Sequence, residues 1–403
     1  MVEKLNFLKL VVKNHPLLTD EISFSLVADQ RVSQDDSDQL TNLYGRIWVN
    51  NVMTIVGRNA TGKTTIMKLL LGTLSFLLNN RSIDQTRLAG TLFGREPITL
   101  ETYFYGSDSK LYLDEVVLSP LQGSWSVESE IIRVKKAYVN DTKNKLFDFT
   151  NADVFRDRSQ LDDLTKSVLA PDDSLFRTVL VQGQKKIYQA QNIFDTLFFT
   201  NVNALTYDQA QVPGTILAYL DPTIEYLKIE TTDAGQSFYR LKFKNSTTEI
   251  TDNNFATIEL YLSSGTAKGI TLYQHVLGVL KVGGIIFIDE LENHFNQAIV
   301  RSFIEYFTNP RINVKRATLI FSTHYSELLD DISRGDQIYI ARRENRMSLT
   351  RYSDTIARSD ISKTEVFDAN NLGGTSPDYD TFIALRKATR EAVNGKLTYC
   401  VTC

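Results

Sequence analysis

The sequence predicts an α/β fold in which helices flank a mixed β-sheet, with an antiparallel β subdomain and an inserted helical region. Three observations support this prediction. A short apolar strand, residues 52–56, runs into a glycine-rich loop and then into an apolar segment of helical character. Repeated β-rich runs, broken by glycine and proline, fill residues 98–139. A second apolar strand, residues 285–288, ends in two carboxylates, as buried parallel strands often do at a ligand site.

The other elements follow from local patterns. Two β-rich runs, residues 5–12 and 21–28, predict a hairpin or a short connection. No glycine or proline occurs between Gln184 and Val212, and the segment IYQAQNIFDTLFF in this stretch predicts a helix. The runs IEYLKIE and SFYRLKF predict a strand pair joined by a turn at Gly235.

These patterns divide the chain into three parts. Residues 1–145 would form the N-terminal part of the core, with the glycine loop and the β subdomain. Residues 146–214 would be a helical insertion, and residues 215–403 would complete the core and end in a tail. The chain is long enough, and with 42% hydrophobic residues apolar enough, to bury a substantial core.

Charge and cysteine content narrow the function classes. The chain has 44 Lys and Arg against 48 Asp and Glu, so no basic excess indicates nucleic acid or an anionic membrane, although a local basic groove stays open. The two cysteines, Cys400 and Cys403, provide no disulfide framework, and no apolar run approaches the roughly 20 residues of a membrane span. We expect a cytoplasmic protein without a membrane segment.

The glycine loop carries the first chemical motif. It fits the pattern GxxxxGK[ST] between a strand and a helix, where backbone N–H groups wrap phosphates. Lys63 would reach the outer phosphates and the Thr64 hydroxyl would ligate Mg²⁺, which predicts ATP with Mg²⁺ as cofactors. The alternative is a chance match in a surface turn. The predicted nucleotide-binding residues here are Gly57, Arg58, Asn59, Ala60, Thr61, Gly62, Lys63, Thr64 and Thr65.

The second motif is Asp289-Glu290, directly after strand 285–288. The carboxyl end of a strand is where open α/β sheets bind their ligands. Asp289 would hold the magnesium shell, and Glu290 would polarise the attacking water. The alternative is a core strand that happens to precede an acidic helix start.

Two further segments could contact a γ-phosphate. Ser263 and Gly265 belong to LSSGT, which precedes a predicted helix and could bind the phosphate of a nucleotide held by another subunit. His324 ends the apolar strand ATLIFSTH, predicted to lie beside the strand of Asp289, and could contact the γ-phosphate and the attacking water. Alone, the first is also an ordinary turn, and a histidine at a strand end is more often structural.

The order of these motifs resembles that of the ABC ATPase superfamily: Walker A, signature motif, Walker B with a catalytic glutamate, and a switch histidine. The segment LENHFN after Glu290 resembles the D-loop, which crosses the dimer interface in that superfamily. The resemblance implies an ABC-type ATPase head, acting as a homodimer or higher homo-oligomer with shared ATP sites. It also implies that Lys63, Glu290 and His324 are catalytic. Ser264 and Thr266 depart from the usual signature residues.

Within the superfamily, GRNATGKT, DELENHFN and FSTHYSELLD resemble the stand-alone ATPases related to the overcoming-lysogenization-defect family, in the AAA15/AAA21 group. This resemblance covers about residues 1–90 and 215–380. It implies the ATPase component of an abortive-infection or PARIS-type phage-defence system, with a separate toxic effector and a phage-encoded trigger. Only a short segment follows His324, without an acidic nuclease cluster, so we expect no nuclease activity.

Several alternatives stay open. The chain could be a DNA-repair or recombination ATPase that binds nucleic acid directly, or a scaffold that binds ATP without hydrolysis, which the retained Glu290 argues against. Cys400 and Cys403 could share a zinc site between subunits or form an ordinary tail. The glutamine of a Q-loop cannot be assigned; the candidates are Gln122, Gln182 and Gln184.

Overall fold

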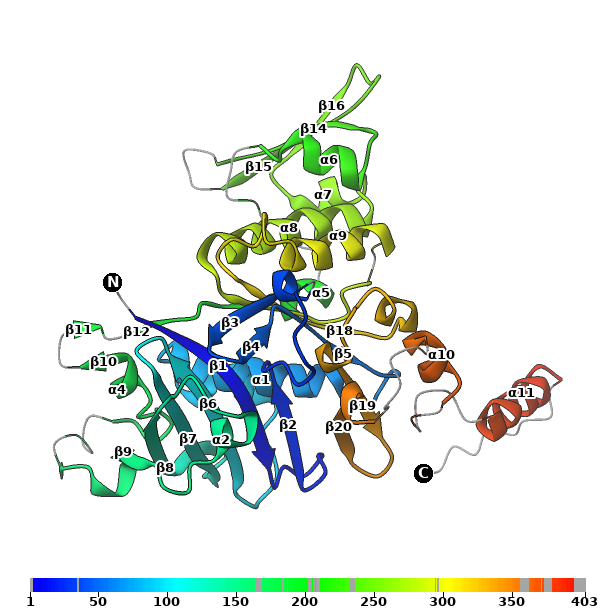
Figure 1. The fold of residues 1–403 in the computed structure, drawn as a ribbon. Helices are drawn as coiled ribbons and strands as arrows, with labels where there is room; N and C mark the ends of the chain where they lie inside the picture. The colour runs from blue at the N-terminus through cyan, green and yellow to red at the C-terminus, as the bar shows by residue number, and fades with distance from the viewer. Residues whose placement is uncertain are drawn as a thin grey trace.

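A computed structural model gives the fold (Figure 1). Among the residues it describes, no helix is both long and apolar enough to cross a membrane. The described residues are 3–34, 36–163, 165, 169–182, 185–186, 188–201, 205, 207, 211–231, 236–293, 295, 297–355, 362–370, 372 and 379–394.

A six-stranded core sheet contains the two apolar strands predicted at residues 52–56 and 285–288. Its first five strands are parallel and the last is antiparallel. The strand order is β13 (Ile193–Asp195), β17 (Ile285–Ile288), β18 (Thr318–Thr323), β5 (Val52–Val56), β19 (Ile338–Arg343) and β20 (Met347–Arg351). Because β18 lies between β5 and β17, the loops that follow these three parallel strands meet at the carboxyl ends of the strands, which is called the site edge of the sheet below. The predicted position of the His324 strand beside the Asp289 strand is confirmed.

The core sheet is covered on both faces, which explains its continuous apolar strands. Side chains alternate along each strand, so Phe287 packs in the cluster with α1 (Lys63–Leu78), whereas Ile286 packs in the cluster with α8 (Ser264–Val282) and α9 (Gln297–Thr308). Helix α1 separates the core sheet from the antiparallel sheet, whose side chains share its cluster (Figure 1).

The predicted β subdomain is confirmed as an antiparallel sheet in which β12 alone pairs in parallel, with β1. The predicted N-terminal hairpin, β1 with β2, belongs to this sheet. Its strands are β12 (Tyr188–Ala190), β1 (Glu3–Lys13), β6 (Ile98–Gly106), β7 (Lys110–Leu121), β8 (Ser124–Lys136) and β9 (Asp153–Asp157), with β2 (Glu21–Ser25) beside β1.

The expectation of a helical insertion over residues 146–214 is wrong for the described part of this region. IYQAQNIFDTLFF contains β12, β13 and the start of the short helix α5 (Leu197–Asn201) instead of one helix. β12 extends the antiparallel sheet and β13 extends the core sheet. Pairing at two sheet edges therefore outweighs the local helical pattern, because tertiary hydrogen bonding and burial override intrinsic propensity.

A third layer lies on the far side of α8 and α9 (Figure 1). It contains the predicted strand pair as β14 (Ile224–Thr231) and β15 (Ser237–Phe243), joined by β16 (Glu249–Asp252). The remaining strands and α-helices are β3 (Leu40–Tyr44), β4 (Ile47–Asn50), β10 (Val181–Gln182), β11 (Lys185–Lys186), α2 (Lys143–Phe147), α4 (Arg177–Leu180), α6 (Gly214–Leu220), α7 (Phe255–Glu259), α10 (Lys363–Asp368) and α11 (Tyr379–Val393). The 3-10 helices span Ser37–Gln39, Ile83–Gln85, Arg87–Gly90, Arg158–Gln160, Ser326–Leu329, Gly335–Gln337 and Tyr352–Asp354.

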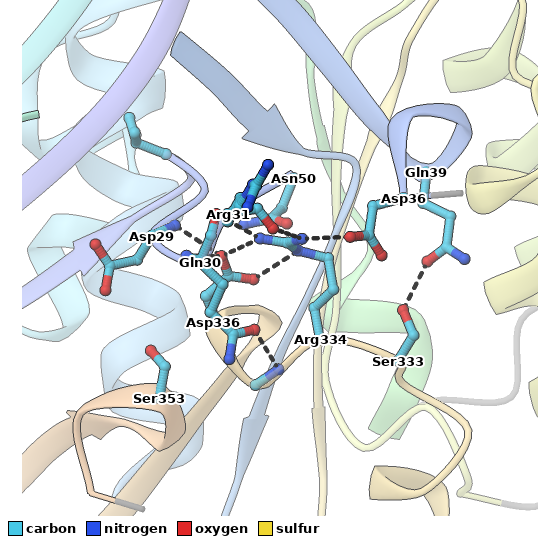
Figure 2. Close-up of polar contacts among 12 residues, drawn as sticks. Asp29, Gln30, Arg31, Asp36, Gln39, Asn50, Ser333, Arg334, Asp336 and Ser353 are labelled. Carbon is cyan, nitrogen blue, oxygen red and sulfur yellow. Dashed lines mark hydrogen bonds and ion pairs between the residues drawn. The ribbon is translucent and has the colours of Figure 1, made fainter. Parts of the chain in front are cut away.

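A buried ion pair fastens the loop after β2 to the start of β19 (Figure 2). The Arg334 guanidinium donates to both carboxylate oxygens of Asp336, at 3.0 and 2.6 Å, and to Asp36 at 3.0 Å. The backbone N–H groups of Asp29 and Gln30 donate to Asp336 Oδ2 at 2.7 and 2.8 Å. Because β19 pairs with β5, this network braces the strand that enters the glycine loop.

The antiparallel sheet also buries two carboxyl groups. Neither carboxyl oxygen of Asp114, on β7, has a hydrogen-bond partner among the described residues, and the side chain is fully buried. Burial and the nearby Glu130 raise the pKa of Asp114 well above its usual range. Glu130 is also buried, but it accepts hydrogen bonds from the backbone N–H of Leu175 at 2.8 Å and from Arg158 at 3.4 Å.

We therefore expect Asp114→Asn to remove a pH-dependent part of the stability. The folded-state pKa of Asp114 lies above the unfolded value, so its contribution is fully present below the unfolded pKa and is lost as pH rises through the folded pKa. Relative to Asp114→Asn, the wild type should lose about 1–3 kcal/mol of unfolding free energy between pH 5 and pH 8. Urea unfolding at both pH values measures this difference. Glu128→Gln, an exposed glutamate on the neighbouring strand β8, is the control, and equal pH slopes for wild type and Asp114→Asn would contradict the assignment.

Candidate active site

The predicted glycine loop lies between β5 and α1, as the sequence indicated. Its backbone enters the left-handed region at Ala60, with φ of 64°, and at Gly62, with φ of 95°. A Cβ atom at Gly62 would lie 1.8 Å from the Met347 sulfur, and one at Gly57 would lie 2.5 Å from the Ala341 carbonyl oxygen. Both glycines are therefore required by close packing of the loop against β19 and β20.

Lys63 is 5% exposed and lies inside this loop. Its ammonium donates to the carbonyl oxygens of Gly57 at 2.8 Å and Arg58 at 3.0 Å. Burial lowers the pKa of Lys63, and nearby carboxylates, Glu290 foremost, oppose that shift. A desolvated ammonium beside backbone N–H groups is suited to bind phosphate, because a low local dielectric strengthens its attraction to an anion.

The other loop residues form its exposed tip and its return to the helix. Thr61 is buried and donates from its hydroxyl to the Arg58 carbonyl at 2.8 Å. Asn59 and Ala60 are exposed, whereas Thr64 and Thr65 are half-buried in the first turn of α1. The tip of the loop is thus exposed to solvent, and the Thr61 hydroxyl closes the loop on itself.

Asp289 and Thr64 meet although 225 positions separate them in the sequence. The Thr64 hydroxyl donates to Asp289 Oδ2 at 2.6 Å. The buried Ser322 hydroxyl donates to the other carboxylate oxygen, Oδ1. A hydroxyl and a carboxylate side by side are the hard oxygen ligands that Mg²⁺ prefers, and few protein ligands suffice when a phosphate supplies others. The residues therefore fit the predicted magnesium site.

Glu290 adopts a backbone conformation that few non-glycine residues adopt, with φ of 48°. Its N–H donates to the Ser322 hydroxyl at 2.8 Å, and its carbonyl accepts from Asn293 at 2.7 Å. These bonds hold the chain in a sharp turn after β17, and the side chain stays half-buried. Left-handed conformations of this kind cost about 1–3 kcal/mol and concentrate at functional sites.

His324, about one third exposed, follows β18 at the same sheet edge. Both its backbone N–H and its ring Nδ1 lie 2.7 Å from Glu292 Oε1. Glu292 itself is buried. No sequence motif assigned a role to Ser322 or, within the D-loop-like segment, to Glu292 itself. The available signal was their distance in sequence: Glu292 follows Glu290 by two residues, and Ser322 precedes His324 by two residues.

The predicted Ser263 and Gly265 lie at the start of α8, whose side chains pack in other clusters than those of α1, the helix that follows the glycine loop. Ser263 is the N-cap of α8, and its hydroxyl accepts from the Thr266 N–H at 3.0 Å. This end of α8 packs with α6 and β14 through Ile270 and its neighbours. The structure thus gathers Lys63, Thr64, Asp289, Glu290 and His324 at one edge and leaves Ser263 and Gly265 apart from them.

One residue of α8 does approach the carboxylates. Lys268, buried, lines a small cavity together with Asp289 and Glu290. Burial lowers its pKa. The helix that begins at the signature-like segment therefore reaches the magnesium side of the site one turn later, which no sequence pattern had indicated.

The remaining sequence candidates divide into two groups. Gln122 lies exposed in the turn between β7 and β8, and Gln182 lies in the two-residue strand β10. Gln184, Cys400 and Cys403 lie outside the described residues, as does His294 in the D-loop-like segment.

A parallel sheet whose strand ends carry a phosphate-binding loop, a hydroxyl–carboxylate pair and a following glutamate defines a P-loop ATPase core. The model of the family described as "AAA domain, putative AbiEii toxin, Type IV TA system" (AAA_21) matches residues 52–330, well over half of the chain. The chain belongs to this family. No curated protein matches its sequence.

Proposed function

We propose that this chain binds and hydrolyses Mg-ATP and that a second copy of the chain completes its site. The observation that carries the proposal is the meeting of Lys63, Thr64, Asp289, Glu290 and His324 at one sheet edge. Thr64 and Asp289 would hold Mg²⁺, which neutralises phosphate charge when bound. Lys63 and the loop N–H groups bind the phosphates, and Glu290 accepts a proton from the attacking water.

The exposed apolar surface beside Ser263 supports the participation of a second copy. Leu260 is 83% exposed and Tyr261 is 51% exposed, directly before the capped start of α8. Exposed apolar residues next to a polar phosphate-binding helix start are suited to dock against another subunit. In the proposed assembly, Ser263 and Gly265 contact the γ-phosphate of the nucleotide held by the partner.

We expect Leu260→Asp to abolish ATP-dependent assembly and to lower hydrolysis at least about 10-fold, because a charge at a buried contact is costly to desolvate. Light scattering with and without Mg-ATP, with phosphate release followed in parallel, measures both effects. Val154→Asp is the control, since Val154 is also an exposed apolar residue, at 55%, but lies on β9 in the antiparallel sheet. Unchanged assembly in Leu260→Asp would remove this surface from the interface. A wild type that neither assembles nor releases phosphate would overturn the proposed function.

We further propose that the assembly acts in phage defence by controlling a separate toxic effector in response to a phage-encoded trigger. Two observations support this role: the family description names a toxin of a toxin–antitoxin system, and the motifs resemble those of abortive-infection ATPases. The test is phage plating on cells that carry the gene with its chromosomal neighbours. Protection should require both this gene and an adjacent effector gene; protection that is absent against a broad phage panel would contradict the role.

A further inference from the structure

Glu292 makes two contacts with one residue. Its Oε1 atom lies 2.7 Å from both the backbone nitrogen and the ring Nδ1 of His324. The carboxylate is buried, and its second oxygen, Oε2, has no hydrogen-bond partner among the described residues.

These contacts bear on which ring nitrogen of His324 carries a proton. A backbone N–H can only donate, so Oε1 accepts the bond from the His324 backbone. An Nδ1–H group at 2.7 Å would be a second donor to Oε1, so this geometry favours the ring form that carries its proton on Nδ1. In that form the other ring nitrogen, Nε2, carries the lone pair and can accept a hydrogen bond.

His324 lies where an acceptor nitrogen could contact the attacking water. The residue directly follows β18, between the strands that lead to the glycine loop and to Glu290. Its side chain is about one third exposed, so water can reach the ring. A neutral nitrogen acceptor here can take a hydrogen bond from a water molecule and so orient it.

We propose that Glu292 is a positioning residue that holds His324 in the Nδ1–H tautomer, so that Nε2 accepts a hydrogen bond from the attacking water. The inference rests on the proposed ATPase function and deepens it. Glu292 acts through His324 and does not itself touch the nucleotide. The arrangement follows the general pattern in which a carboxylate on one ring nitrogen sets the chemistry of the other.

The tautomer can be measured directly. Histidine-selective ¹⁵N labelling and magic-angle-spinning NMR at pH 8 report which nitrogen of each ring is protonated, and His324→Gln identifies its signal among the four histidines. We expect Nδ1 protonated and Nε2 unprotonated in the wild type, and a shift toward Nε2–H in Glu292→Ala. A wild-type His324 protonated at Nε2 would overturn the proposal, whether or not the protein hydrolyses ATP.

Kinetics provide the second readout. Glu292→Ala should lower kcat about 10- to 100-fold, as loss of a carboxylate partner does for other positioned histidines, with KM and ATP binding nearly unchanged. Glu292→Gln keeps an oxygen acceptor for Nδ1 and should recover part of the rate. Glu305→Ala, an exposed glutamate on α9, is the control. Full activity in Glu292→Ala would refute the positioning role. An inactive wild type would instead reject the proposed ATPase function, and the NMR result would then decide the tautomer alone. If Glu292→Ala does not fold, Glu292→Gln and the wild-type NMR spectrum still decide.

Discussion

Glu290→Gln should slow ATP hydrolysis at least about 100-fold while ATP stays bound, because the amide cannot accept a proton from the attacking water. Glu290 is half-buried at the turn after β17, next to the Asp289–Thr64 pair, and its backbone is held by Ser322. Since glutamine keeps the size of the side chain, the loop geometry should persist. Phosphate release and equilibrium binding of a fluorescent ATP analogue measure the two effects separately.

The same variant should lengthen the lifetime of the ATP-bound assembly, and light scattering after dilution into nucleotide-free buffer follows its decay. Glu327→Gln is a suitable control, since Glu327 is exposed three residues beyond His324. Hydrolysis at the wild-type rate in Glu290→Gln would assign the base to another residue.

Lys63→Met should weaken ATP binding about 10- to 100-fold and abolish measurable hydrolysis. The expected loss corresponds to a charge-assisted hydrogen bond of about 1.5–3 kcal/mol to the phosphates. Methionine keeps the apolar stem that packs in the loop but removes the ammonium that Gly57 and Arg58 hold. Isothermal titration with ATP in the presence of Mg²⁺ measures the affinity.

Lys68→Met, further along α1, controls for the loss of a lysine from this helix. Thermal unfolding of both variants checks that the loop still folds. ATP affinity that is equal in Lys63→Met and wild type would mean that the ammonium does not contact phosphate, and the glycine loop would then lose its assigned role.

The strands and loops that carry the site could be predicted because their signals are local. Val52–Val56 and Ile285–Ile288 are continuous apolar runs, each followed directly by its polar motif, and the structure has both as buried core strands. The placement of His324 beside them followed from the same kind of run, Thr318–Thr323. Each of these predictions depends on a few adjacent residues and on the rule that parallel strands meet ligands at their carboxyl ends.

The rest could not be predicted because it depends on contacts between distant segments. Tyr188–Ala190 and Ile193–Asp195 become strands only because two sheets offer open edges to them. Glu292 and Ser322 acquire their roles only when β17 and β18 lie side by side. No periodicity within either segment encodes which residue of the other strand it will face.

The order of strands in the core sheet has a consequence for how the protein is made. β5 leaves the ribosome early, but its neighbour β18 starts at Thr318 and must enter between β5 and β17, both synthesised before it. Non-local pairings of this kind form slowly, since a long chain must first close into a loop. Until β18 is synthesised, the facing edges of β5 and β17 therefore have no partner from this part of the sheet, and such open edges are sites where other chains can pair.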